Sequence, residues 1–119
     1  MIPRRAFQIA AFFGFLAVAL GAFGAHGLKS ALTTLGTVDS FEVAVRYQFF
    51  HALAMLVLAR LRPFPAGPWW CFAIGILVFS GSLFVLALTG LKWLGAVTPI
   101  GGGAFLAGWL WLVIRAPRD

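Results

Sequence analysis

The sequence predicts an all-α, polytopic membrane protein in which four transmembrane helices form one compact bundle. Of its 119 residues, 62% are hydrophobic and 10% are charged, whereas soluble domains carry about 25% charged residues. Four apolar runs each approach the roughly 20 residues that cross a bilayer core. A soluble fold of this size could not bury so much apolar surface, so we expect a single transmembrane domain over residues 1–119.

The four expected helices are separated by short segments rich in glycine, proline and charged residues. The helices are predicted at about residues 6–25, 41–60, 69–89 and 96–115. The first apolar run is longer than the roughly 7–15 residues of a signal-peptide core, which predicts a retained span. Because glycine and proline end helices, the connections are predicted at residues 27–38, 60–68 and 90–95.

Local motifs predict where two of these helices begin. Asp39 and Glu42 have the spacing of a capping box, in which Asp39 caps the free amides of the second helix. Thr98-Pro99 predicts the start of the fourth helix, because proline at the first helical position loses no hydrogen bond. A helix that begins there has about 17 residues before Arg115, at the short end for a span.

The basic residues predict that both termini lie in the cytoplasm. In a four-span arrangement the arginines of the connections and termini fall on one side of the bilayer and two lysines on the other, and the positive-inside rule places the arginines inside. These arginines are Arg4, Arg5, Arg60, Arg62, Arg115 and Arg118, and the lysines are Lys29 and Lys92. As members of aromatic belts, Trp69 and Trp70 are expected at the inner interface and Trp93 at the outer one.

Composition disfavours several classes of function. The net charge of +6 lies mostly between apolar runs and not in a basic, aromatic groove, so no nucleic-acid partner is expected. The three acidic residues could supply an acid and base pair in one pocket only by using Asp39 or Glu42, which already have capping roles, so no enzyme activity is expected. No cofactor and no metal are expected, because the two histidines, His26 and His51, should lie at different depths and Cys71 is the single cysteine.

Small residues recur along one face of the first helix and, more briefly, of the fourth. At about 100° per residue they share a sector of about 100°. The residues are Ala10, Gly14, Ala17, Gly21 and Gly24, with Gly101, Ala104 and Gly108 in the fourth helix. In lipid such a groove lets helix backbones approach closely, so we predict helix packing, with a backbone-lined ligand site as the alternative.

The second helix holds the polar residues that are most costly in lipid. Glu42 and Arg46 are spaced to form an ion pair near the outer interface. His51 lies about 12 Å below the outer end of the helix, and an ionisable side chain at such depth is a candidate functional site. The alternative, which we favour, is a neutral imidazole hydrogen-bonded to a hydroxyl such as Ser80 or Ser82, or to a carbonyl freed near a glycine.

Four segments resemble, in order and in spacing, the small membrane proteins of domain-of-unknown-function family 423, whose eukaryotic relatives are called transmembrane protein 256. The segments read LGAFGAHGLK, YQFFHALA, FSGSLFVLALTG and WLGAVTPIGG and begin at residues 20, 47, 79 and 93. The resemblance implies about four helices in a bacterial inner membrane or an organelle membrane. It implies no established activity and carries over no catalytic residue.

The polar residues in and beside these segments are predicted to converge in the outer half of the bundle as one hydrogen-bonded cluster around the glycine groove. This predicted polar cluster comprises His26, Tyr47, Gln48, His51, Ser80, Ser82 and Thr98. For His26, a second prediction is that it caps the carbonyl groups of the following loop.

Two functions follow from these features. The favoured one is structural: an accessory subunit or assembly partner of a larger membrane complex, or a homo-oligomer, in which the partners are the lipid bilayer and other membrane helices. The alternative is a small transporter, channel or lipid-binding protein that uses the polar cluster around His51.

Overall fold

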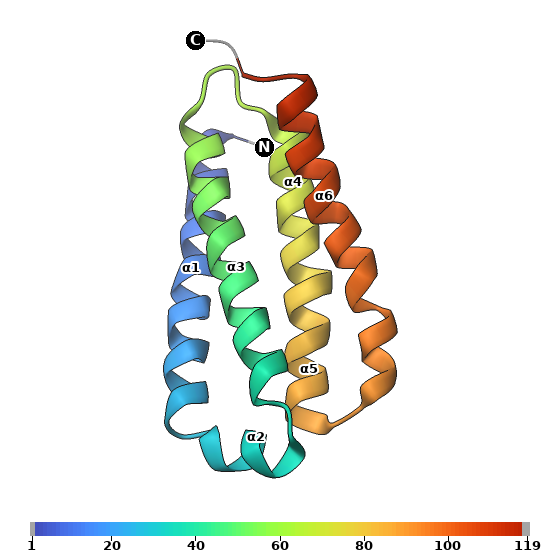
Figure 1. The fold of residues 1–119 in the computed structure, drawn as a ribbon. Coiled ribbons are helices and arrows are strands. Elements are labelled where there is room, and N and C mark those ends of the chain that lie inside the picture. Colours follow the sequence, from blue (N-terminus) through green and yellow to red (C-terminus); the bar gives the residue numbers. More distant parts are fainter. Residues whose placement is uncertain (1, 118–119) are drawn as a thin grey trace.

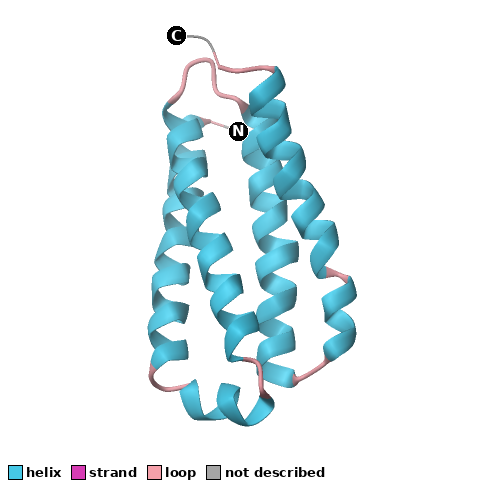
Figure 2. Cartoon of the chain, viewed as in Figure 1, coloured by secondary structure: helices cyan, strands magenta, loops and turns pink. Residues whose placement is uncertain are grey.

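The computed structural model describes residues 2–117, which form four antiparallel helical rods with both chain ends at the same end of the bundle (Figure 1). Every regular element within these residues is helical (Figure 2). The elements are α1 (Pro3–Ala25), α2 (Lys29–Leu35), α3 (Val38–Arg60), α4 (Ala66–Gly75), the π-helical η1 (Ile76–Ser80), α5 (Gly81–Thr89), the 3-10 helix η2 (Lys92–Ala96) and α6 (Thr98–Ile114). Four continuous rods, Pro3–Ala25, Val38–Arg60, Ala66–Thr89 and Lys92–Ile114, are long and apolar enough to span a membrane.

Each rod begins three or four residues before the position predicted from the apolar runs. The runs mark the hydrocarbon core, whereas a helix extends into the interface until its terminal amides reach water. The predicted capping box at Asp39 is wrong, because Val38 already begins α3 and the helix has no side-chain cap. The predicted start of α6 is confirmed: the helix runs from Thr98 to Ile114, 17 residues, with proline in its first turn.

The predicted connection at residues 27–38 contains a short helix of its own. Leu32, on the inner face of α2, is 1% exposed and packs with Phe41 and Ala87 in a small apolar core. The helix ends at Gly36, whose φ of +70° lies in the left-handed region that favours glycine. This segment therefore closes one end of the bundle as a packed cap.

Small residues on α1 form its contact with α3, mostly as predicted. Ala10 and Ala17 are buried, and Gly24 lies so close to the ring of Phe41 that a Cβ there would clash with it. Gly21 approaches Val45 more loosely, since a Cβ would lie 3.3 Å from its Cγ1. Gly14 is the exception, because a Cβ at this position would meet nothing within 4 Å. Its predicted packing role is wrong.

Glycines and aromatic rings interlock between α6 and the third rod. A Cβ at Gly108 would lie 2.6 Å from the ring of Phe72. At Gly101 it would meet the backbone of Phe79, within the π-helical turn. Ala104 is only half-buried. Two reciprocal contacts were not predicted, in which rings of α6 cover glycines of α4: Trp111 covers Gly67, and Phe105 covers Gly75.

The tryptophans expected at the inner interface have different environments. Trp70 is 46% exposed, as a belt residue would be, but Trp69 is 1% exposed in the main apolar core. Trp69 is therefore not an exposed belt residue as predicted, because its indole packs inward, where burial of a large ring is favourable. Its Nε1 is the one buried side-chain polar atom without a hydrogen-bond partner among the described residues.

Candidate functional site

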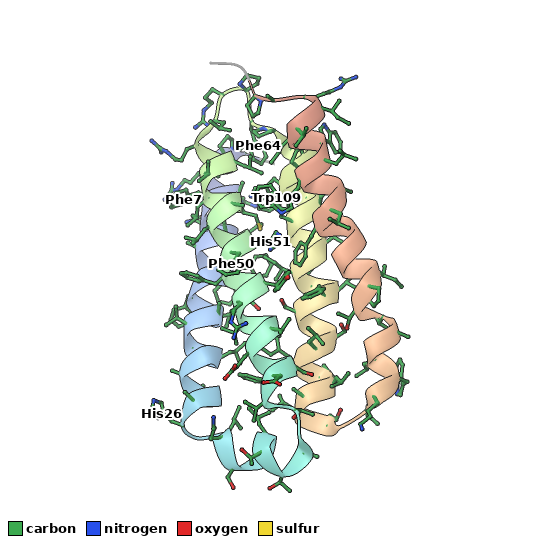
Figure 3. The ribbon with its side chains drawn as sticks, in the orientation of Figure 1. Phe7, His26, Phe50, His51, Phe64 and Trp109 are labelled. Atoms are coloured by element: carbon green, nitrogen blue, oxygen red, sulfur yellow. The ribbon has the colours of Figure 1, made fainter. Side chains whose placement is uncertain are left out.

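His51 lies near the middle of the bundle, on the side of α3 that faces α6 (Figure 3). Its ring is 5% exposed and stacks on Phe105 with centroids 3.7 Å apart and planes 11° apart. Phe72 meets the same imidazole edge-on at 5.3 Å. Residues of α3, α4 and α6 thus hold one imidazole in a single orientation.

Both ring nitrogens of His51 have hydrogen-bond partners. Trp109 Nε1 donates to His51 Nε2 at 3.0 Å, and His51 Nδ1 lies 2.7 Å from the carbonyl oxygen of Tyr47. An indole N–H can only donate and a carbonyl oxygen can only accept. The contacts therefore select the neutral tautomer that carries its proton on Nδ1. In this state the imidazole is satisfied without a counter-ion.

A shallow groove of about 480 Å³ lies on the surface of the bundle next to this histidine, between α3 and α6. Tyr47 forms part of its wall, 41% exposed, with its ring 4.8 Å from that of Phe79. The other lining residues are His51, Pro99, Gly102, Gly103, Phe105, Leu106 and Trp109. This His51 groove is almost entirely apolar, so it suits a hydrocarbon chain or an apolar helix face.

The predicted polar cluster does not form as one network. Gln48 Nε2 donates to the carbonyl of Phe13 in α1 at 2.8 Å. Ser80 Oγ donates to the carbonyl of Ala44 in α3 at 2.8 Å. Ser82 and Thr98 share a hydrogen bond of 2.7 Å between α5 and α6. The prediction is wrong because these short side chains reach only the nearest neighbouring helix, so each forms a separate pair.

His26 takes no part in these contacts. It follows the last residue of α1, and its side chain is exposed at the corner of the bundle far from His51 (Figure 3). Its backbone N–H, not its imidazole, bonds to the carbonyls of Ala22 and Phe23. Neither predicted role of this side chain, cluster member or loop cap, is seen among the described contacts.

Two residues that form hydrogen bonds to other helices were not predicted to do so. Trp109 is the partner of His51, where the sequence suggested Ser80 or Ser82. Thr37, the residue before α3, donates from its hydroxyl to the carbonyl of Ala87 in α5 at 2.7 Å. The signal for Trp109 was available: in lipid an indole N–H needs an acceptor, and this chain has few. Nothing local singled out Thr37.

We expect Thr37→Val to lower the free energy of unfolding by about 1 kcal/mol, because it removes a buried hydrogen bond and keeps the side-chain shape. Thermal unfolding in detergent measures the change. Thr34→Val is the matched control, since its hydroxyl bonds within exposed α2 to the carbonyl of Ser30, and should shift stability by less than about 0.5 kcal/mol. Equal losses in the two variants would contradict an interhelical role for Thr37.

The predicted ion pair is present but exposed. Arg46 Nη2 lies 3.5 Å from Glu42 Oε2, and the two side chains are 60% and 51% exposed. An exposed pair one helical turn apart contributes about 0.5 kcal/mol or less. It does not position the groups around His51.

The fold and its polar contacts define a small integral membrane protein with four candidate spans, in which buried polar side chains join neighbouring helices. The family described as "Protein of unknown function (DUF423)" matches residues 20–102. The chain is 42% identical to the UPF0382 inner membrane protein YgdD of Escherichia coli, over 99% of this chain and 93% of that protein. It is also 39% identical to the UPF0382 membrane protein YwdK of Bacillus subtilis, over 87% of this chain and 88% of that one.

A UPF0382 membrane protein of Staphylococcus haemolyticus is 43% identical over 83% of this chain and 84% of its own length. No solved structure matches. The chain belongs to the DUF423 (UPF0382) family of membrane proteins. It is a multi-pass protein of the inner membrane, as the resemblance implied.

Proposed function

We propose that this protein is a non-enzymatic structural component of the membrane, an accessory subunit of a larger complex or a homo-oligomer. One observation carries the proposal. All five polar residues buried in the described bundle form hydrogen bonds that join different elements. They are Thr37, Gln48, His51, Ser80 and Ser82. Their polar groups thus serve helix association, which gives the bundle a defined shape to present to a partner.

We propose that this partner contacts the face of α6 that points away from the bundle. Gly103 has nothing within 4 Å of a Cβ position, and Leu106 beside it is 72% exposed. An open glycine next to large apolar side chains allows a further helix to approach closely. The His51 groove continues this face towards α3.

Photo-crosslinking in native membranes tests this proposal. A photoreactive residue at Leu106 should give a protein adduct, and the mass of that adduct separates a second copy from another subunit. The same residue at Phe15, 67% exposed on α1, is the control and should react mainly with lipid. Lipid adducts alone at both positions would refute the assembly role.

We place both termini in the cytoplasm. Arg4, Arg5, Arg60, Arg62 and Arg115 lie near the end of the bundle that holds both termini, whereas Lys29 and Lys92 lie near the other end. Arg118, counted with the first group in the sequence, is outside the described residues. This distribution supports the orientation by the positive-inside rule. Labelling of single introduced cysteines at Ser30 and Ala116 with a membrane-impermeant reagent in intact cells should modify only the former, in a Cys71→Ser background.

A second candidate function rests on the His51 groove. Its volume of about 480 Å³ and its apolar wall favour binding of a lipid chain beside the imidazole. In that case His51→Ala would abolish binding of a photoactivatable fatty acyl probe even by the fraction of the protein that remains folded. A parallel loss of folding would instead support the structural role. Trp109→Phe, which retains an aromatic ring in the groove, is the matched variant.

A further inference from the structure

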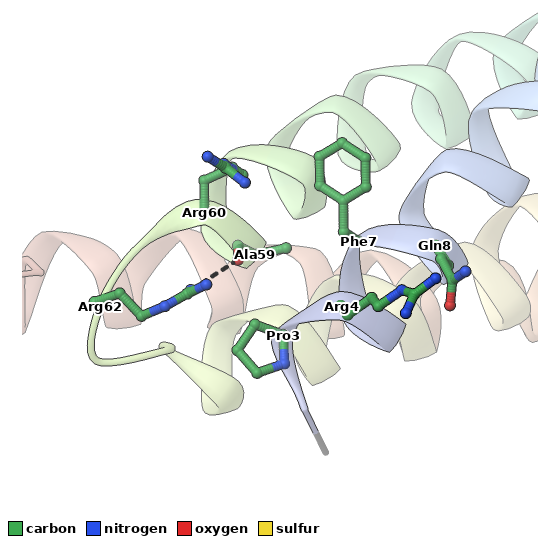
Figure 4. Close-up of a pocket in the computed structure, with 7 residues that line it drawn as sticks. All are labelled: Pro3, Arg4, Phe7, Gln8, Ala59, Arg60 and Arg62. Carbon is green, nitrogen blue, oxygen red and sulfur yellow. Dashed lines mark hydrogen bonds between the residues drawn. The ribbon is translucent and has the colours of Figure 1, made fainter.

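Three arginines surround a depression at the end of the bundle that holds both termini (Figure 4). The depression lies between the start of α1 and the end of α3 and has a volume of about 330 Å³. Arg4 comes from the first turn of α1, Arg60 ends α3, and Arg62 follows it in the connection to α4. We call this site the arginine pocket. Gln8 adds an amide to its lining.

The positive charge of the arginine pocket is not balanced by any described carboxylate. The single salt bridge among residues 2–117 is that of Arg46 with Glu42. The chain has three acidic residues. Asp39 and Glu42 lie in the first turns of α3, at the opposite end of the bundle, and Asp119 lies outside the described residues. Three guanidinium groups line one depression without a described carboxylate among them, so a bound anion would be attracted by all three.

One arginine of the pocket is held in place by the backbone. Arg62 Nη1 donates to the carbonyl of Ala59 at 3.2 Å (Figure 4) and to that of Leu61 at 3.0 Å. These bonds use carbonyls at the C-terminus of α3, which have no partner within the helix. A guanidinium carries five N–H donors, so donors remain for a ligand. The fixed, planar group matches the geometry of a phosphate, which it can bind through two parallel hydrogen bonds.

The surroundings of the pocket match a lipid better than a free ion. The rod of 23 residues that contains Arg4 is about 34 Å long, close to the roughly 30 Å of the hydrocarbon core. The arginines at its end therefore lie at the level of the headgroups. Phe7, one turn further into the bundle, lines the same depression and is 42% exposed. An acyl chain can pack on this ring while the headgroup phosphate stays among the arginines.

We propose that the arginine pocket binds the phosphate of an anionic phospholipid, with Arg4, Arg60 and Arg62 as its ligands and Phe7 in contact with the acyl chain. Basic pockets between the ends of membrane helices bind anionic headgroups by this chemistry. No residue of α6 lines the site, which is therefore independent of the assembly role proposed above. It gives this end of the bundle an annular lipid that bridges α1 and α3.

Native mass spectrometry of the detergent-purified chain tests the proposal, with phosphatidylglycerol, cardiolipin, phosphatidylethanolamine and inorganic phosphate as separate probes. We expect the two anionic lipids to bind more tightly than the zwitterionic one. Arg62→Gln should weaken anionic-lipid binding about fivefold, and the triple Arg-to-Gln variant at positions 4, 60 and 62 about a hundredfold. Phosphate at the same concentration should not displace the lipid.

Arg5→Gln is the matched control, because it removes the same charge from the neighbouring position of α1 without lining the pocket. It should change lipid affinity less than about twofold. A loss in Arg5→Gln equal to that in Arg62→Gln would overturn the site in favour of diffuse surface charge. Displacement by phosphate, or equal binding of phosphatidylethanolamine, would also overturn it. If the triple variant does not fold, the lipid affinities of Arg62→Gln and Arg62→Lys test the proposal instead. The side chain of Arg62 is exposed, so these single substitutions should not prevent folding.

Discussion

Gly101→Ala is expected to lower the free energy of unfolding by about 3 kcal/mol, or to prevent folding. A Cβ at position 101 would meet the backbone nitrogen of Phe79 and lie 2.7 Å from its Cα. Backbone atoms cannot move aside as the end of a flexible side chain can, so α6 would have to separate from the π-helical turn. The hydrogen bond between Ser82 and Thr98, close to this contact, would be lost with it. Unfolding in detergent, by heat or by added SDS, measures the effect.

Gly103→Ala, two residues further along α6, separates this clash from the general effect of adding a methyl group. A Cβ at Gly103 meets nothing within 4 Å, and alanine favours a helix over glycine by about 1 kcal/mol. We therefore expect Gly103→Ala to be neutral or slightly stabilising. Equal losses of stability in both variants would show that α6 does not pack against Phe79 as described.

His51→Ala is expected to lower the free energy of unfolding by about 3 kcal/mol. It removes a ring stacked on Phe105 and leaves a cavity, and it deprives the indole N–H of Trp109 of its acceptor. In lipid no water replaces that acceptor, so the unpaired donor adds to the loss of packing. The same unfolding measurement on His51→Ala and the parent chain tests this expectation.

Trp109→Phe separates the hydrogen bond from the packing around His51. It keeps an aromatic ring against Phe72, which lies 4.8 Å away between centroids, and removes only the donor and part of the ring. A double-mutant cycle of Trp109→Phe with His51→Ala should give a coupling free energy of about 0.6 kcal/mol, the average for hydrogen bonds between membrane helices, and at most about 1.7 kcal/mol. Additive effects would mean that the 3.0 Å contact contributes nothing to stability.

The number of membrane spans, their approximate positions and the contact face of α1 could be predicted because lipid imposes a simple rule on sequence. A span must be apolar for about 20 residues, and a face of small residues allows close contact. Helix ends were less accessible: Asp39 and Glu42 have a capping spacing, yet α3 begins at Val38. Helix α2 was not predicted either. Its one buried leucine, Leu32, packs against residues of α3 and α5, and the sequence of α2 alone does not contain that contact.

The pairing of polar side chains depended on geometry that no local pattern contains. His51, Gln48 and Ser80 were singled out as members of the predicted polar cluster, and in lipid each must find a hydrogen-bond partner. Which partner each one finds depends on the rotation and depth of the neighbouring helix. In that arrangement His51 accepts a hydrogen bond from Trp109, 58 residues further along the chain, and His26 lies outside the bundle.

The amino-acid order alone thus determines a four-span membrane bundle and the polar residues that must find hydrogen-bond partners inside it. The reason is that the free energy of transferring each group into lipid depends mainly on its own chemistry. The tertiary structure alone decides that these residues form separate interhelical bonds, that Gly101 touches the backbone of Phe79, and that Arg4 meets Arg60 and Arg62 around one pocket. Such contacts join segments far apart in the chain. Their free energy depends on ångström-scale distances that are set only when all four rods pack together.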